Sequence, residues 1–141
     1  MILFINAVKS DIYLALIKNK GKNDPEIVGK LYSAGDNIYR RDLLNLIENL
    51  LKTENKDVSA LKGIMVINGP GSFTSIRIAL TTANLIAYNL KIPIVGLSNE
   101  NDEDNFVLIK NGLQLLKKQS NRRAPHRIIY PFYNQQPNIT R

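Results

Sequence analysis

The chain has 141 residues and contains no cysteine. It can therefore hold no disulfide framework, no thiolate nucleophile and no cysteine-based metal site. A lack of cysteine fits proteins of a reducing interior, so we expect a cytoplasmic location. No uncharged apolar run reaches the roughly 18 residues of a membrane-spanning helix. We accordingly expect no contact with a membrane.

Groups of residues with catalytic or metal-binding spacing are also missing. No cluster of Asp, Glu and His has the spacing of metal ligands, so we expect no metal site. The single histidine, His126, lies among arginines and has no recognisable orienting partner. A general base needs such a partner and a pocket. We therefore expect a solvated histidine and no catalytic residue in this chain.

Negative charge is absent from the last quarter of the chain. Residues 1–104 hold 12 basic and 12 acidic residues, whereas residues 105–141 hold seven basic residues and no acidic one. A basic tail of this kind is either a solvated extension or a contact for a phosphate-rich partner. The candidate contact residues are Lys117, Lys118, Arg122, Arg123 and Arg127.

Three apolar segments near the start predict an antiparallel meander. Ile2 to Asn6, Ile12 to Ile17 and Glu26 to Tyr32 are rich in β-branched and aromatic residues and are joined by short polar turns. The opening MILFINAVKSD lacks the basic lead and cleavage site of a signal peptide, and we expect it to form the first strand.

Two helices and two further strands are predicted after the meander. Tyr39 to Lys52 and Thr74 to Leu90 have helical spacing, and the apolar segments Gly63 to Ile67 and Ile92 to Val95 are typical of buried parallel strands. The order β-β-β-α-β-α-β predicts an α/β fold with a mixed five-stranded sheet and right-handed crossovers. This order is expected of a ribonuclease-H-like lobe, the building block of the actin-like ATPase superfold.

The region after residue 98 fits two competing structures, a hairpin and a helix. The segments Phe106 to Lys110 and Leu113 to Lys117 flank Asn111-Gly112, which is a strong hairpin signal. A helix from Val107 to Gln119 is the competing interpretation, and Gly112 weakens it.

A glycine-rich turn precedes the second predicted helix. It consists of Gly69, Pro70, Gly71, Ser72, Phe73 and Thr74. A helix N-terminus after such a turn is a generic anion site. The spacing of a phosphate-binding P-loop is absent, and Ser72 or Thr74 can cap the helix instead. Two interpretations stay open, a structural turn and a phosphate cradle.

The second predicted helix has no charged residue between Arg77 and Lys91, and it has two apolar faces. One face fits the sheet. On the other, Ile78 and Leu85 form a ridge, which either packs on the first helix or belongs to a protein interface. Both hold if the two helices share one docking surface. The predicted partner-binding residues are Leu44, Leu51, Ile78, Thr81, Thr82, Leu85 and Asn89.

The stretch GPGSFTSIRIALTTANLIAYNLKIPIVGLS, residues 69–98, closely resembles the signature segment of the TsaB family, also called YeaZ. The turn, Arg77, the small-residue helix and the closing strand all match. The opening MILFINAVKSDIYLALIKN looks like the opening hairpin of the family, and the ending YPFYNQQPNITR is similar to its usual C-terminus.

The chain departs from the family pattern at two places. The first strand of the family ends in Asp-Thr-Ser, but the matching positions here are Asn6, Ala7 and Val8. A neutral Asn6 cannot supply the charge that holds a metal–phosphate. The family also has a second lobe of about a hundred residues. We therefore expect an N-terminal lobe over 1–98 and a reduced remnant with a basic tail over 99–141.

The resemblance implies an accessory subunit without catalytic activity of its own. TsaB proteins pair with TsaD, which transfers a threonylcarbamoyl group to N6 of adenosine 37 in tRNAs reading ANN codons, and TsaE joins the pair. ATP and metal are then expected on the partner subunits. Whether the chain forms a homodimer when TsaD is absent stays open. The chain would meet tRNA either indirectly, through its partners, or through the basic tail. The alternative is a small phosphotransferase or ATPase that uses the Gly69 to Thr74 turn.

Overall fold

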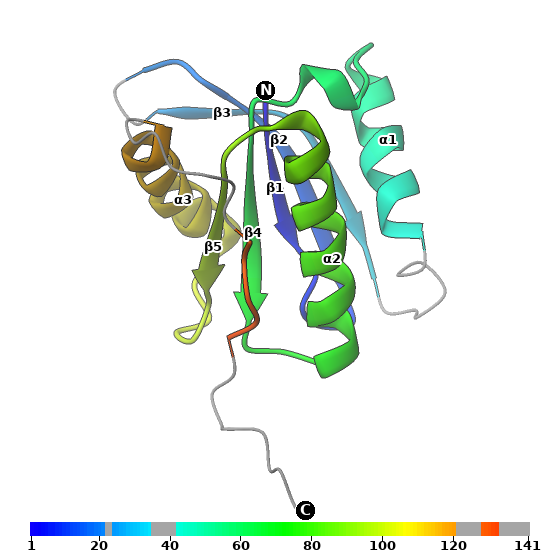
Figure 1. Cartoon of the computed structure of the whole chain (residues 1–141), viewed down its shortest axis with the longest axis vertical. Coiled ribbons are helices and arrows are strands. Elements are labelled where there is room, and N and C mark those ends of the chain that lie inside the picture. The colour runs from blue at the N-terminus through cyan, green and yellow to red at the C-terminus, as the bar shows by residue number, and fades with distance from the viewer. Residues whose placement is uncertain (22–23, 35–41, 121–127, 133–141) are drawn as a thin grey trace, which may run out of the picture.

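The computed structural model describes residues 1–21, 24–34, 42–120 and 128–132, and its centre is a five-stranded sheet (Figure 1). The strand order is β3-β2-β1-β4-β5, in which β1 pairs antiparallel with β2 and parallel with β4. The predicted mixed sheet is therefore confirmed. Its strands are β1 (Ile2–Asn6), β2 (Ile12–Asn19), β3 (Pro25–Ser33), β4 (Gly63–Gly69) and β5 (Ile94–Ser98).

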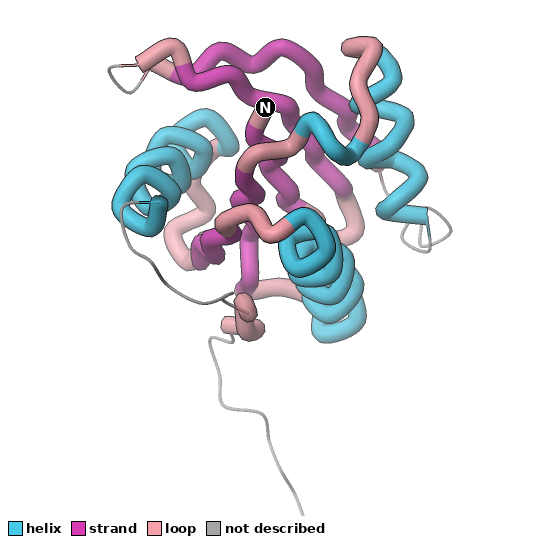
Figure 2. The backbone as a smooth tube through the Cα atoms, turned by 45° about the horizontal axis from the view of Figure 1, so that its top comes forward, coloured by secondary structure: helices cyan, strands magenta, loops and turns pink. Residues whose placement is uncertain are grey.

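Helices cover both faces of the sheet (Figure 2). The helices α1 (Leu43–Thr53) and α2 (Phe73–Leu90) lie on one face and contact each other. A short 3-10 helix, η2 (Val58–Ala60), precedes β4. The helix α3 (Asn105–Ser120) packs on β4 and β5 from the other face. Of the first predicted helix, residues 39–41 lie outside the described part of the chain.

The predicted hairpin over residues 106–117 is wrong, and the competing helix is correct. Leu108, Ile109, Leu113 and Leu116 are all buried, which is a helical spacing. Gly112 faces the sheet, and a Cβ there would collide with the sulfur of Met65. The glycine therefore permits close packing of a helix on β4, and it does not form a turn.

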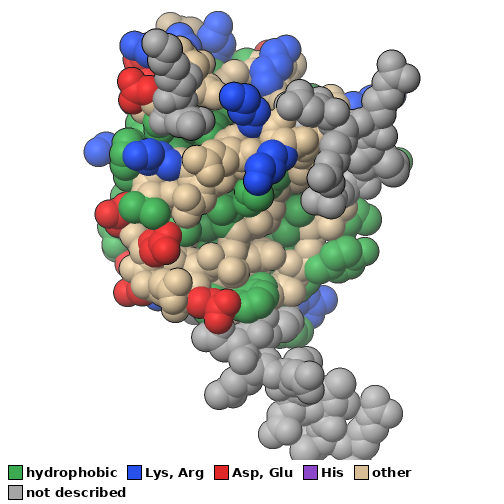
Figure 3. All heavy atoms as spheres, turned by 90° about the vertical axis from the view of Figure 1, so that its left-hand side faces the viewer, with side chains coloured by type: hydrophobic (Ala, Val, Ile, Leu, Met, Phe, Trp, Pro, Cys, Tyr) green, Lys and Arg blue, Asp and Glu red, His purple; other side chains and the backbone are tan. Residues whose placement is uncertain are grey.

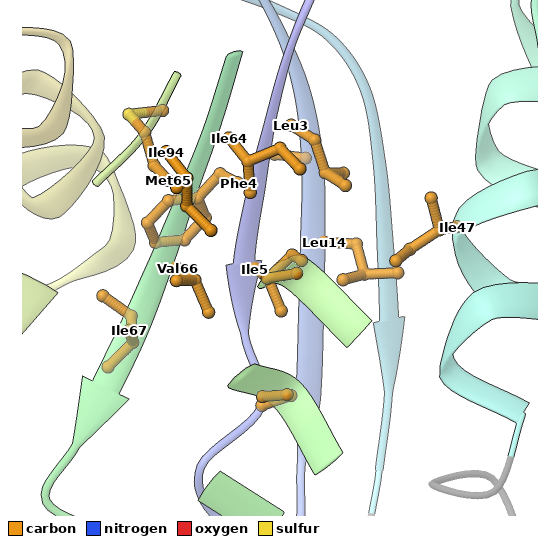
Figure 4. Packing of buried hydrophobic residues seen from close by; sticks show 14 of the residues in the cluster. Leu3, Phe4, Ile5, Leu14, Ile47, Ile64, Met65, Val66, Ile67 and Ile94 are labelled. Carbon is orange, nitrogen blue, oxygen red and sulfur yellow. The ribbon is translucent and has the colours of Figure 1, made fainter. Parts of the chain in front are cut away.

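The buried side chains form one core that includes α3. Leu3, Phe4 and Ile5 of β1 are fully buried because the central strand is covered on both faces. Leu14 of β2 and Ile47 of α1 point toward each other between the sheet and the helix (Figure 4). Leu116 of α3 lies against Gly63, at 3.4 Å from the place of its missing Cβ. The helix that follows residue 98 thus belongs to the same core as the lobe before it.

Candidate functional site

The outward face of α2 carries the predicted docking ridge. Leu85 is 57% exposed, although it is a large apolar side chain. Ile78 is half-buried against the core, so only Leu85 of the ridge is largely exposed. The predicted rim surrounds them, with Thr81 and Asn89 exposed and Thr82 half-buried. The structure thus brings these five predicted residues onto one side of one helix.

The helix α1 contributes less to this surface than the sequence predicts. Leu44 is 45% exposed and is available to a partner. Leu51 was predicted to bind a partner, but this is wrong because its side chain is fully buried. It lies on the same face of α1 as Leu43, Ile47 and Leu50, which pack on the sheet. The wide apolar arc of this helix mostly covers the strands beneath it.

Two exposed aromatic residues of α2 were not predicted to belong to the surface. Phe73 is 58% exposed and Tyr88 is 66% exposed. The guanidinium of Arg77 lies over the ring of Phe73, 5.1 Å from its centroid. These positions share the outward side of α2 in helical spacing, so a count along the helix would have found them. They widen the apolar face around the one charged residue of the helix.

The glycine-rich turn is filled by the chain itself. Ser72 is the N-cap of α2, and its Oγ accepts a hydrogen bond from the amide of Ser75 at 3.3 Å. The amide of Ser72 donates to the carbonyl of Val8 at 2.8 Å. A Cβ on Gly71 would collide with that same carbonyl. The amides of Ser72 and Ser75 and the space beside Gly71 are therefore already used at this turn.

The remaining residues of the turn follow the same structural pattern. Gly69 has φ of +138°, a backbone conformation that favours glycine, and it is joined to Pro70 by a cis peptide bond. Thr74 is exposed and lies in the first turn of α2.

A pocket of about 260 Å³ lies beside this turn, at the carboxyl ends of β1, β4 and β5. Open α/β sheets usually bind ligands at such an edge. Asn6 donates a hydrogen bond from Nδ2 to Oδ1 of Asn105 at 2.7 Å, so this side chain is tied to the start of α3. Charged residues also line the pocket, namely Asp11, Asp102, Glu103 and Asp104 with a single lysine, Lys9.

The charges of this pocket are unsuited to phosphate. Four carboxylates and one ammonium group leave a negative field, and Lys9 already faces Asp102 at 3.7 Å. Tyr32 donates a hydrogen bond to Asp11 at 2.8 Å, and this bond raises the pKa of the phenol above its ordinary value. Burial raises the pKa of Tyr13 in the same pocket. In the described part of the chain no group of acidic and histidine residues could hold a metal ion.

Basic residues gather at the opposite end of the sheet. Lys117 and Lys118 are exposed in the last turn of α3, where cations favour the helix dipole. The pKa of the Met1 amino group is lowered, first by burial and then by Lys62 and other lysines nearby. Figure 3 shows basic side chains toward the top of this face and acidic ones toward the bottom. The predicted contacts Arg122, Arg123 and Arg127 lie outside the described residues, as does His126.

Comparisons with known proteins find relatives that are named for tRNA modification. The family model described as "TsaD: tRNA N6-adenosine threonylcarbamoyltransferase" matches residues 34–100. TsaB of Buchnera aphidicola subsp. Schizaphis graminum is 31% identical over 94 residues, covering 63% of this chain and 45% of the relative. The solved structure of YeaZ from Pseudomonas aeruginosa is 23% identical and covers 70% of this chain and 43% of that one, with a TM-score of 0.58.

This chain is similar to TsaB proteins over part of its length. It also resembles the threonylcarbamoyltransferase of Geotalea daltonii, at 37% identity over 54 residues, which are 38% of this chain and 16% of that protein. The chain spans less than half the length of these curated relatives. The actin-like, ribonuclease-H-like fold predicted from the sequence is confirmed by the YeaZ structures. Among the described residues, no helix is both long and apolar enough to cross a membrane.

Proposed function

We propose that this chain is a non-catalytic TsaB-like subunit that pairs with a TsaD protein. The pair would support transfer of a threonylcarbamoyl group to N6 of adenosine 37 in tRNAs that read ANN codons, with TsaE as a third component. The names of the relatives support this role, because they include both TsaB and threonylcarbamoyltransferase proteins. In this role, ATP and metal would bind to the partner subunits.

The exposed side of α2 carries the proposal. Leu85, Phe73 and Tyr88 are each more than half exposed on a helix whose outward face has only one charged residue, Arg77. Exposing three large apolar side chains on one helix is costly unless a partner covers them. An apolar centre with Thr81 and Asn89 at its edge has the composition of a protein interface. A second copy of this chain is the alternative occupant when TsaD is absent.

The first test is a charge placed in the centre of the surface. Leu85→Arg should weaken binding to the TsaD of the same cell by at least about tenfold, because the interface would bury an unpaired cation. Binding is measured by pull-down and by calorimetry with purified proteins.

The matched control is Leu115→Arg. Leu115 is 40% exposed on α3, on the opposite face of the sheet, so its substitution should leave binding unchanged. Equal binding by the wild type and Leu85→Arg would refute the proposed surface. Equal loss in both variants would indicate a general effect on folding, and circular dichroism would detect it.

A phosphotransferase is the weaker alternative. The four carboxylates of the pocket and the hydrogen bond between Asn6 and Asn105 both oppose phosphate binding there. Heat released on mixing the isolated chain with Mg-ATP would favour this alternative.

We also propose that the basic end of α3 contacts tRNA. Lys117 and Lys118 support this proposal because they are exposed at the end of the sheet opposite the acidic pocket. The contact would be made with phosphates, which lysine binds as a point charge.

A further inference from the structure

A short C-terminal segment, Ile128 to Phe132, lies beside the ends of β4 and β5, far from them in the sequence (Figure 1). We name it the strap. It contacts Asn84 of α2 and Gly96 of the edge strand β5, and we call the place that it occupies between them the groove. The last element before the strap in the sequence is α3, which lies on the opposite face of the sheet from α2. Nothing in the proposed pairing with TsaD assigns a role to this groove.

The groove binds the backbone of the strap. The side chain of Asn84 donates to the carbonyl of Ile129 at 2.9 Å and accepts from its amide at 2.9 Å. The amide group of Asn84 thus bonds both backbone groups of Ile129, as the backbone of a neighbouring strand would. Asn68 adds two more bonds, since Nδ2 donates to the carbonyl of Tyr130 at 3.1 Å and its own carbonyl accepts from the amide of Phe132 at 2.8 Å.

Two glycines leave the space that the strap occupies. A Cβ on Gly96 of β5 would lie 2.6 Å from Cγ2 of Ile129. A Cβ on Gly69 would collide with the carbonyl oxygen of Phe132. Any other residue at these places would push the strap out of the groove, because real Cβ atoms do not approach so closely. The same Gly69 that suggested an anion site is therefore part of a site for peptide backbone.

The side chains of the strap alternate in burial. Ile129 packs against the core, whereas Ile128 is 59% exposed and Tyr130 is 71% exposed. One inward side chain between two outward ones is the pattern of an added extended segment. The contacts therefore combine backbone recognition with one apolar anchor.

We propose that this groove is a peptide-binding site and that its ligand is the strap sequence Ile-Ile-Tyr-Pro-Phe, held as a separable segment. The site takes an extended apolar peptide with one buried aliphatic side chain at the position of Ile129. The chain's own strap fills the site, because the bonds of Ile129, Tyr130 and Phe132 to Asn84 and Asn68 are made within one chain. A tethered strap competes with free peptide because its effective concentration is about millimolar.

The test uses the full chain with its own strap displaced. In Ile129→Arg the anchor is charged, so the strap leaves the groove and Asn68 and Asn84 become available. A labelled peptide of residues 128–132 should then bind this variant at least about tenfold more tightly than the wild type, as measured by fluorescence anisotropy. The same peptide carrying arginine at the second position should not bind.

The matched control removes the receptor side of the contact. Adding Asn84→Ala to Ile129→Arg should abolish peptide binding, whereas adding Asn89→Ala should not, because Asn89 is exposed on the same helix. Peptide binding that is absent from Ile129→Arg, equal in the wild type, or insensitive to Asn84→Ala would overturn the proposal.

Hydrogen exchange on the wild type tests the proposal without any substitution. The amides of Ile129 and Phe132 are hydrogen-bonded within the groove. A separable strap predicts protection of both amides that is lost together, at a lower opening free energy than for Val66 in β4. Protection equal to that of β4, or no protection, would contradict a separable strap.

A mixture of two full-length variants identifies the source of the strap. Asn84→Ala has an intact strap and a damaged groove, whereas Ile129→Arg has an intact groove and a damaged strap. A heterodimer of the two in native mass spectrometry would overturn delivery of the strap by its own chain. Monomers in the mixture, together with peptide binding to Ile129→Arg, assign the strap to its own chain.

Discussion

At the residue scale, the side chains around the Gly69 to Thr74 turn satisfy one another. Ser72 caps α2, and the buried hydroxyl of Ser75 donates to Ser72 Oγ at 3.0 Å. The amide of Ser72 is taken by Val8. An anion would have to displace these bonds, each of which contributes about 1 kcal/mol. This turn joins β4 to α2 and holds both against the end of β1.

The cap predicts a measurable loss of stability. Ser72→Ala should lower the free energy of unfolding by about 1 to 2 kcal/mol, because it removes the cap and leaves the Ser75 hydroxyl without its acceptor. The measurement is urea denaturation with an unchanged slope. Thr74→Ala is the control. Thr74 is exposed in the first turn of α2, so its substitution should change the free energy of unfolding by less than about 0.5 kcal/mol. Similar losses in both variants would speak against a specific capping role for Ser72.

At the element scale, the sequence predicted the strands and helices of the first 98 residues because their periodicity is strong. The order of the elements, the antiparallel meander and the glycine-rich connection agree with the structure. The hairpin was preferred over the third helix because Asn111-Gly112 is a local turn signal, whereas Met65, which Gly112 contacts, lies 47 residues earlier in the sequence. Tertiary packing decides such a position, and local pattern cannot show it.

The candidate site was predicted only in part, for a related reason. The outward side of α2 follows from spacing, and Leu85 was found in this way. Leu51 was wrongly assigned to the partner-binding surface. The apolar arc of α1 is wide, and the sequence does not show which edge of the arc packs on the sheet. Asn84 lies 45 positions before its partner in the strap, and Asn68 lies 62 positions before its partner. No local sequence pattern predicts contacts over such separations.

The close packing of α3 on β4 gives a second prediction. Gly112→Ala should destabilise the chain by about 1 to 3 kcal/mol, because the added methyl group collides with Met65, although alanine favours a helix. The double variant with Met65→Val should recover part of the loss, since valine is shorter. Gln114→Ala, at an exposed position of the same helix, is the control and should be neutral. Additive effects of Gly112→Ala and Met65→Val in thermal unfolding would refute the contact.

At the scale of the whole molecule, charge and apolar surface are distributed over different sides. The carboxyl ends of the parallel strands carry an acidic pocket, and the opposite end of the sheet carries lysines with the amino terminus (Figure 3). The outward side of α2 is nearly free of charge. The side of α2 that is poor in charge and the basic end of α3 are therefore separate surfaces, as the proposed contacts with TsaD and tRNA require.

This separation predicts that RNA binding and partner binding can be changed independently. Replacing Lys117 and Lys118 by glutamate should weaken tRNA binding and flatten its dependence on salt by about one to two units of log–log slope, because two phosphate contacts would be lost.

The control replaces Lys30 and Lys52 by glutamate. Both lysines are exposed away from the end of α3, and the net charge changes equally. Affinity is measured by filter binding over a series of salt concentrations, and binding to TsaD should be unchanged in both variants. An equal change of slope in the two double variants would mean that only net charge matters, and an unchanged slope in both would exclude a tRNA contact at the end of α3.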